Sequence, residues 1–320
     1  MSESTAMLQH QIGSASDLQS VVRTMRALAA SSISQYERSV LALADYRLAV
    51  NLGLGACLRL VESTTSTRLD GRPAATGAVG AIVFGSDQGL VGQFNEVIVD
   101  HVLKTLLPLP GKRAVWAVGE RVRARLVEAG VAVTGTYAVP NSIEAIAPLV
   151  DRLQVDTETH RSQGSQPRIH VFYNRPKPGG LYQPGDQRLL PLDAQWEADL
   201  VAPRWPTPNP PEVMGRGTTA LRALIREHLF ISLFRACAES LASENASRLA
   251  AMERADKNID ELLASLRGRF QRQRQGSIDE ELFDVTAGYE ALSNGEPVHG
   301  RQASMITLSA RVSAAFPKVS

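Results

Sequence analysis

The chain has 320 residues, a formal net charge of +1 and two cysteines. This length is typical of about two domains. The near-zero charge excludes a general electrostatic attraction to nucleic acid or anionic lipid, so we predict no nucleic-acid partner. Cys57 and Cys237 are too far apart for a metal-binding motif and too few for a disulfide scaffold.

The N-terminal residues "MSESTAMLQHQIGSASD" have neither a basic segment nor an apolar core of the kind found in secretory signals. No apolar run reaches the ~18–20 residues that cross a bilayer. We therefore expect a chain that stays inside the cell and does not span a membrane.

A long helix is predicted from about Thr5 to Glu62, because this stretch contains no proline. Its apolar or small residues recur at steps of three and four, which is typical of a coiled-coil seam. These seam positions are Leu8, Ile12, Ala15, Leu18, Val22, Met25, Ala29, Ile33, Tyr36, Val40 and Leu43. Gly13 weakens the first turns, and Ser16 or Asp17 could cap a helix that restarts there.

Between about Gly77 and Asp193, short β-type runs alternate with helical stretches. This alternation predicts an α/β layer with a largely parallel sheet. The predicted strands are "AVGAIVF", "RAVWAVG", "GVAVTGTYA" and "RIHVFYN", and the predicted helices are "GQFNEVIVDHVLKTLL", "ERVRARLVEAG" and "NSIEAIAPLVDRL". "DTETHRSQGSQP" is predicted to be a polar loop, and "PRWPTPNPPEVMGRGT" a connector that leaves the layer.

A second proline-free helix is predicted from about Thr218 to Leu292, with seam residues Met252, Ala255, Ile259, Leu262 and Leu266. A lone helix of this length cannot bury its apolar stripe, so the first helix is its expected partner. The predicted fold is α/β: both termini form a long antiparallel two-helix coiled coil, and a Rossmann-like α/β domain is inserted between them. The expected domains are residues 1–70, 71–216 and 217–292, with an extension of unknown role at 293–320.

The stretch "VFGSDQGLVGQFNEVI" resembles the start of a phosphate-binding loop. A P-loop needs Lys followed by Ser or Thr after its last glycine, and a dinucleotide loop needs G-x-G-x-x-G. Gly85, Gly89 and Gly92 satisfy neither pattern. We therefore interpret the glycines as permitting tight turns, with Ser86, Asp87 or Asn95 as a helix cap.

Catalytic motifs are not found either. The six histidines are scattered, and no G-x-S-x-G elbow is present. We predict no catalytic residue, no cofactor site and no metal site in this chain.

Four arginines fall within eight residues of the second helix, at Arg267, Arg269, Arg272 and Arg274, before an acidic run. A solvated helix face is one explanation. The seam, however, becomes polar near Gln273 while the helical pattern continues. This change suggests that the helix leaves its partner within the chain there and faces another protein, whose carboxylates arginine can bind in a bidentate manner.

Three motifs now resemble the gamma subunit of F-type ATP synthases. They are "VVRTMRALAASSISQYERSV" in the first helix, "GSDQGLVGQFN" in the loop, and the long segment from "LFISLF" to "TAGYEAL" in the second helix. The resemblance extends from about Gln11 to Leu292. Ser32, where the family usually has lysine, and the length of the C-terminal tail indicate a divergent branch, with an alternative F-type ATPase left open.

The resemblance implies a central rotor shaft inside three alpha and three beta subunits, with a Rossmann-like domain that meets epsilon and the membrane c-ring. Chemistry would occur on beta, and gamma would be non-catalytic. The implied location is the cytoplasmic face of a bacterial or archaeal plasma membrane, where the chain would be peripheral. The sequence does not choose between H⁺ and Na⁺ as the coupled ion.

Six partner-interface residues are carried over from the family's motifs. They are Met25, Asp87, Arg248, Arg274, Gln275 and Glu281. Met25 and Arg248 match positions near the lower part of the beta subunits. Arg274 and Gln275 match a pair that binds a beta loop.

Two other functions remain as alternatives. One is a small-molecule-binding α/β protein whose helices only dimerise, and the other is a free-standing coiled-coil scaffold. Binding of a substrate or nucleotide by the isolated chain would favour the first, and self-assembly would favour the second.

Overall fold

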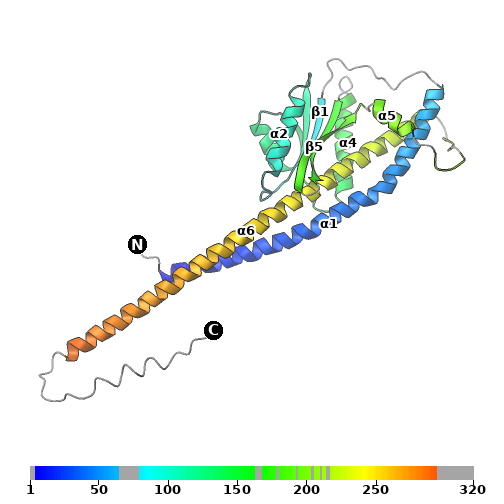
Figure 1. The fold of residues 1–320 in the computed structure, drawn as a ribbon. Helices are drawn as coiled ribbons and strands as arrows, with labels where there is room; N and C mark the ends of the chain where they lie inside the picture. Colours follow the sequence, from blue (N-terminus) through cyan, green and yellow to red (C-terminus); the bar gives the residue numbers. More distant parts are fainter. Residues whose placement is uncertain are drawn as a thin grey trace. The chain divides into compact units, whose positions relative to one another are not determined.

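The computed structural model describes residues 4–64, 79–162, 168–177, 180–191, 194–202, 205–209, 211–213 and 217–293. Its helices and strands follow the predicted alternation (Figure 1). In chain order they are α1 (Thr5–Thr64), β1 (Val79–Phe84), α2 (Phe94–Leu106), β2 (Arg113–Val118), α3 (Glu120–Glu128), β3 (Val133–Tyr137), α4 (Ile146–Ser162), β4 (Arg168–Lys177), β5 (Gly180–Leu190), α5 (Ala194–Val201) and α6 (Gly217–Ser293).

The chain forms two compact units, one of residues 1–15 with 261–320 and one of residues 16–260. In the larger unit, α1 and α6 run antiparallel, since Gln19 bonds to Asp256 whereas Tyr46 bonds to Glu227. The predicted tail at 293–320 begins at the last described residue. The predicted boundary between residues 70 and 71 lies outside the described residues.

The buried face of α1 repeats every seven residues. Of the residues at this interval, Leu43 is half-buried and the others are buried, namely Leu8, Ala15, Val22, Ala29, Tyr36, Val50 and Cys57. A heptad repeat of this kind keeps one stripe of a helix on its partner.

Two predicted seam residues are wrong. Leu18 is 55% exposed and Leu262 is 50% exposed. The heptads place the next residue in the seam in each case, so Gln19 and Leu263 are buried instead. The helix does not restart near Ser16, because α1 is continuous from Thr5.

By length and composition alone, the part of α1 from Thr5 to Leu60 could cross a membrane, since it contains an 18-residue window with a mean hydropathy of 1.3. The apolar residues of α1 also have a structural explanation, since its seam packs against another helix of the same chain. That the chain does not span a membrane stays a prediction.

The inserted domain is built on a five-stranded sheet with the order β3-β2-β1-β4-β5. The first four strands are parallel and β5 pairs antiparallel with β4. The sequence analysis missed β5, whose residues "GLYQPGDQRLL" include a proline and polar residues, and also α5. It also placed a loop where α4 continues to Ser162.

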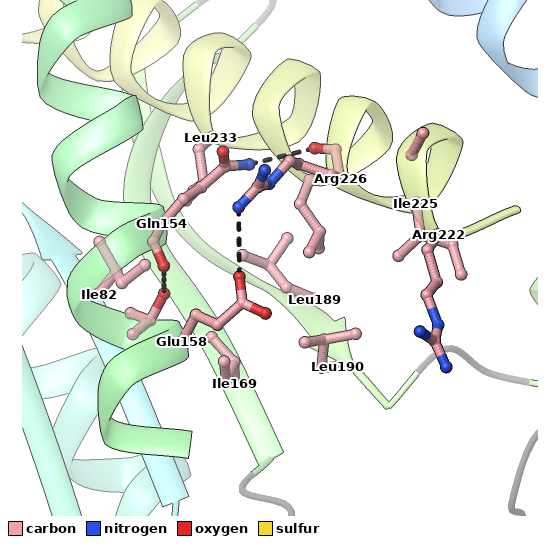
Figure 2. A pocket seen from close by; sticks show the side chains of 13 residues that line it. Ile82, Gln154, Glu158, Ile169, Leu189, Leu190, Arg222, Ile225, Arg226 and Leu233 are labelled. Carbon is pink, nitrogen blue, oxygen red and sulfur yellow. Dashed lines mark hydrogen bonds and ion pairs between the residues drawn. The ribbon is translucent and has the colours of Figure 1, made fainter. Parts of the chain in front are cut away.

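Helices cover both faces of this sheet. α2 and α3 pack on one face, where Ile98, Val102, Val122 and Leu126 are fully buried. α4 and part of α6 pack on the other face, and a pocket opens between these two helices (Figure 2). The long C-terminal helix α6 is therefore one of the layers of the domain.

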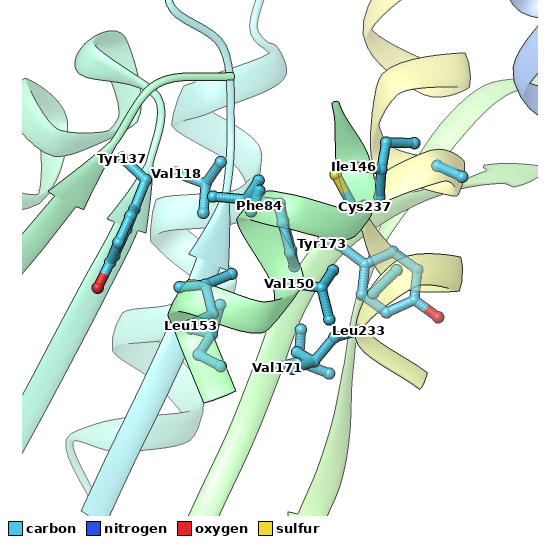
Figure 3. Packing of buried hydrophobic residues seen from close by; sticks show 14 of the residues in the cluster. Phe84, Val118, Tyr137, Ile146, Val150, Leu153, Val171, Tyr173, Leu233 and Cys237 are labelled. Atoms are coloured by element: carbon cyan, nitrogen blue, oxygen red, sulfur yellow. The ribbon is translucent and has the colours of Figure 1, made fainter. Parts of the chain in front are cut away.

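The core between the sheet and α6 contains the larger side chains of the domain (Figure 3). Leu233 and Cys237 of α6 lie there with Phe84, Val171 and Tyr173 of the strands. Burial raises the pKa of the Cys237 thiol, so this cysteine stays protonated inside the core. The predicted α/β fold with a two-helix antiparallel coiled coil is confirmed.

Candidate functional site

The glycine-rich loop after β1 is closed by its own side chains. Asn95 accepts a hydrogen bond from the Ser86 backbone N–H at 3.0 Å and donates one to the Ser86 hydroxyl at 2.8 Å. Gly85 has no room for a side chain, because a Cβ there would lie 2.3 Å from the Cβ of Val122. The glycine therefore permits a close approach of the loop to α3, as the turn interpretation predicts.

The Asp87 side chain connects the loop after β1 to the start of α3 and to the segment after β3. Its carboxylate accepts hydrogen bonds from the backbone N–H groups of Glu120 at 2.9 Å and of Val139 at 2.8 Å. Asp87 therefore caps the start of α3. This agrees with the expectation that Ser86, Asp87 or Asn95 caps a helix, whereas Gln93 at the start of α2 makes no side-chain cap.

α6 lies against the loop at the carboxyl ends of the parallel strands. Folds of this type bind ligands where the strand order reverses, which here is between β1 and β4. The Ser247 hydroxyl of α6 donates a hydrogen bond to the carbonyl of Val91, and Asn174 of β4 donates one to the carbonyl of Phe94 at 2.9 Å. The polar side chains of Ser247 and Asn174 at this edge are therefore bonded within the protein.

Arg248 forms a buried ion pair within α6. Its guanidinium donates to the Glu244 carboxylate at 2.7 Å, and the two side chains are only 15% and 7% exposed. Burial raises the pKa of Glu244, and the charge and hydrogen bond of Arg248 offset part of this increase. The predicted interface residue Arg248 thus has a partner inside its own helix.

A polar layer interrupts the seam of the larger unit. Asp256 lies on the buried stripe of α6, and its carboxylate accepts hydrogen bonds at 3.0 Å from Gln19, 3.1 Å from Arg23 and 3.0 Å from Arg26. Burial alone raises the pKa of Asp256, but these hydrogen bonds and the arginine charges lower it on balance. Met25 is half-buried beside this layer on α1.

Arg274, Gln275 and Glu281 are exposed on α6 in the smaller unit. In the same unit, Gln273 and Arg272 line a shallow hollow against Leu8. The predicted loss of apolar seam near Gln273 therefore coincides with the first turns of α1. The partner contacts of the three exposed residues stay a prediction.

An apolar stripe that was not predicted lies near the end of α6. Ile278, Leu282, Val285 and Tyr289 are between 54% and 74% exposed. They step by four, three and four residues, so they share one face of the helix. This spacing was available in the sequence and could have identified the stripe.

Among the predicted residues, Asp87 and Arg248 come from distant parts of the chain and both act on Glu244. Glu244 connects them, because it pairs with Arg248 and its pKa is raised slightly further by the charge of Asp87. Within the described residues, no group of His, Cys, Asp or Glu side chains could hold a metal ion.

Comparison with known proteins identifies the family. A family model described as ATP synthase matches residues 4–292. The ATP synthase gamma chain of Roseiflexus castenholzii is 27% identical over 297 residues, which cover 91% of this chain and 99% of the relative. The ATP synthase gamma chain of Anaeromyxobacter sp. (strain K) is 28% identical over 298 residues, 89% of this chain and 98% of the relative.

Solved structures share the fold. A chain of the Euglena gracilis mitochondrial ATP synthase, from a structure of OSCP, F1 and the c-ring, aligns with a TM-score of 0.58 at 15% identity and covers 94% of this chain and 98% of its own length. A chain from the rotor of the same enzyme aligns with a TM-score of 0.57 at 15% identity, over 86% and 98%. The chain therefore belongs to the gamma-chain family of the ATP synthases.

Proposed function

We propose that this chain is the central rotor shaft of an F-type ATP synthase and that it couples ion flow through the membrane sector to ATP synthesis or hydrolysis on the beta subunits. As a gamma chain it is a subunit of a rotary complex that is associated with a membrane. In this proposal the chain itself is non-catalytic. The hydrogen bond from Ser247 to Val91 supports this view, because it brings α6 against the loop where folds of this type bind their ligands.

The exposed stripe Ile278, Leu282, Val285 and Tyr289 is the observation that carries the proposal. An apolar stripe on a helix in water is unfavourable and marks a surface that a partner covers. In the smaller unit, α6 continues past the first turns of α1, so no part of α1 covers the end of the stripe (Figure 1). We propose that the alpha and beta subunits of the catalytic head, three of each, surround this end.

The charged residues next to the stripe would bind the same partners. Arg274 and Gln275 are exposed and present hydrogen-bond donors, and Glu281 presents a carboxylate one to two turns further along. Arginine suits this position because its planar guanidinium binds carboxylates and carbonyls with a defined geometry.

Met25, Asp87 and Arg248 are proposed as contacts nearer the domain. Met25 has a half-exposed thioether, whereas the polar groups of Asp87 and Arg248 are engaged within the chain. For these two, the proposed role is to hold the loop and the helix in place beside a partner.

The proposed shaft consists of residues 1–70 and 217–292, with the domain of residues 71–216 at its foot, where epsilon and the c-ring would bind. The extension at 293–320 would follow the end that enters the head. The proposed location is the cytoplasmic face of a bacterial or archaeal plasma membrane.

The test is co-expression with the alpha and beta subunits of the same organism, followed by mass measurement of the intact complex. We expect three alpha, three beta and one gamma chain. The double variant Leu282→Glu/Val285→Glu should abolish capture, because it puts two charges on the stripe without disturbing a buried site. Asp284→Ala, on the same turns, should assemble normally.

Two outcomes would count against the proposal. One is a wild-type chain that does not join the hexamer. The other is a double variant that assembles and couples ATP hydrolysis to rotation as well as the wild type does.

A further inference from the structure

A pocket of about 480 Å³ lies between α4 and α6, away from the residues assigned to the head (Figure 2). Its floor comes from the strands, with Ile82 of β1, Ile169 of β4 and Leu189 of β5. Leu229 and Leu233 of α6 complete an apolar lining. This volume and lining fall in the range of pockets that hold small molecules, about 300–1,000 Å³.

Most polar groups of the pocket are already engaged. The Gln154 amide donates to the carbonyl of Arg226 at 3.1 Å, and the Thr157 hydroxyl donates to the carbonyl of Leu153 at 2.7 Å. The Arg226 guanidinium lies 3.6 Å from the Glu158 carboxylate (Figure 2). These groups offer little to a sugar or another ligand that needs many hydrogen bonds.

Arg222 is the remaining charge. It is exposed at the end of the pocket far from Gln154 in Figure 2, and the described residues give it no ion pair. Since Arg226 pairs with Glu158, the pocket combines an apolar interior with one positive charge at its rim, Arg222, that no described residue compensates. A polyphosphate would need several such charges, and a neutral apolar molecule would not use this one.

We propose that this pocket binds an amphipathic monocarboxylate, a molecule with an unbranched apolar chain and a single carboxylate. The chain lies on Ile169, Leu189 and Leu229, and the carboxylate accepts hydrogen bonds from Arg222. Because α4 belongs to the domain and α6 to the shaft, a ligand here adds contacts between the two.

Decanoate is the probe, titrated into the full-length chain below its micelle concentration and followed by calorimetry. We expect one saturable site. Octanoate is two methylenes shorter than decanoate. Each methylene removed should weaken binding about fourfold. Arg222→Gln should weaken decanoate about tenfold or more, the loss expected for a charge-assisted hydrogen bond. It should leave decanol binding unchanged.

Two variants keep the test specific. Ala223→Trp fills the pocket from an exposed position of α6, so it should abolish binding without affecting folding. Arg254→Gln removes an exposed arginine of the same helix outside the pocket and should bind decanoate as the wild type does.

The proposal is overturned if decanoate does not bind at submillimolar concentration, or if Ala223→Trp binds it unchanged. It is also overturned if Arg222→Gln and Arg254→Gln behave alike, because the charge would then have no role. None of these results bears on assembly with the alpha and beta subunits.

Discussion

Removing the guanidinium of Arg248 should lower the unfolding free energy, because the buried Glu244 carboxylate loses its partner. In Arg248→Ala, the Glu244 carboxylate would stay in a site where its side chain is 7% exposed, without its partner at 2.7 Å. Breaking a buried ion pair from one side costs about 3–5 kcal/mol of unfolding free energy. One oxygen of Glu244 already lacks a hydrogen bond within the described part of the chain, so little else can compensate.

The effect should depend on pH with a definite sign. Burial raises the pKa of folded Glu244 above its value in the unfolded chain, so the folded state binds more protons between the two values. Stability therefore falls as pH rises through this window, and loss of Arg248 raises the folded pKa further. We expect Arg248→Ala to be impaired more at pH 8 than at pH 5.

Urea unfolding at the two pH values, followed by circular dichroism and tryptophan fluorescence, measures this difference. Coincident curves establish that one transition is being compared. Glu244→Gln in the Arg248→Ala background should recover part of the loss and remove its added pH dependence. Arg267→Ala, an exposed arginine of α6, should change stability by less than about 0.5 kcal/mol.

The reasoning would be refuted if Arg248→Ala cost less than about 1 kcal/mol at pH 8, the range of an exposed ion pair. Arg248 would then be free for a partner subunit, as its match to the family motif first suggested.

Three further predictions concern the loop and the seam. Gly85→Ala should lower the unfolding free energy by about 3 kcal/mol or more, since its Cβ would lie 2.3 Å from a buried valine; Gly268→Ala, with open space in α6, should raise it by about 0.5–1 kcal/mol. Asp87→Ala should cost about 1–2 kcal/mol in the same urea assay through loss of its cap. Asp256→Leu alone should lower the melting temperature because Gln19, Arg23 and Arg26 lose a shared acceptor and Gln19 keeps only Asp260, whereas adding Gln19→Leu should restore part of the loss. Equal melting temperatures for the single and double variants would contradict that reasoning.

The sequence predicted the long elements well because their signals are strong. The absence of proline and the repeated apolar steps located α1 and α6 to within a few residues. The first four strands followed from their apolar runs. β5 was missed because an edge strand with Pro184 and Gly185 does not alternate in a regular way.

The sites were harder to predict because they depend on contacts between distant residues. Gln19 was excluded from the seam as a polar residue, but Asp256, 237 positions away, supplies its partner. Arg248 matched a family motif, yet its ion pair lies on the same helix. The spacing of Glu244 and Arg248, four residues apart, would have suggested that pair.

The seven-residue interval of the buried face of α1 has a mechanical consequence. An α-helix turns every 3.6 residues, so a stripe that repeats every 7 residues stays on its partner only if the two helices wind around each other with a left hand. Val22, Ala29, Tyr36, Val50 and Cys57 impose this winding within the larger unit. A torque in the sense of the winding tightens the contact, and a torque in the opposite sense loosens it. The elastic response of these helices to twisting therefore differs between the two directions of rotation.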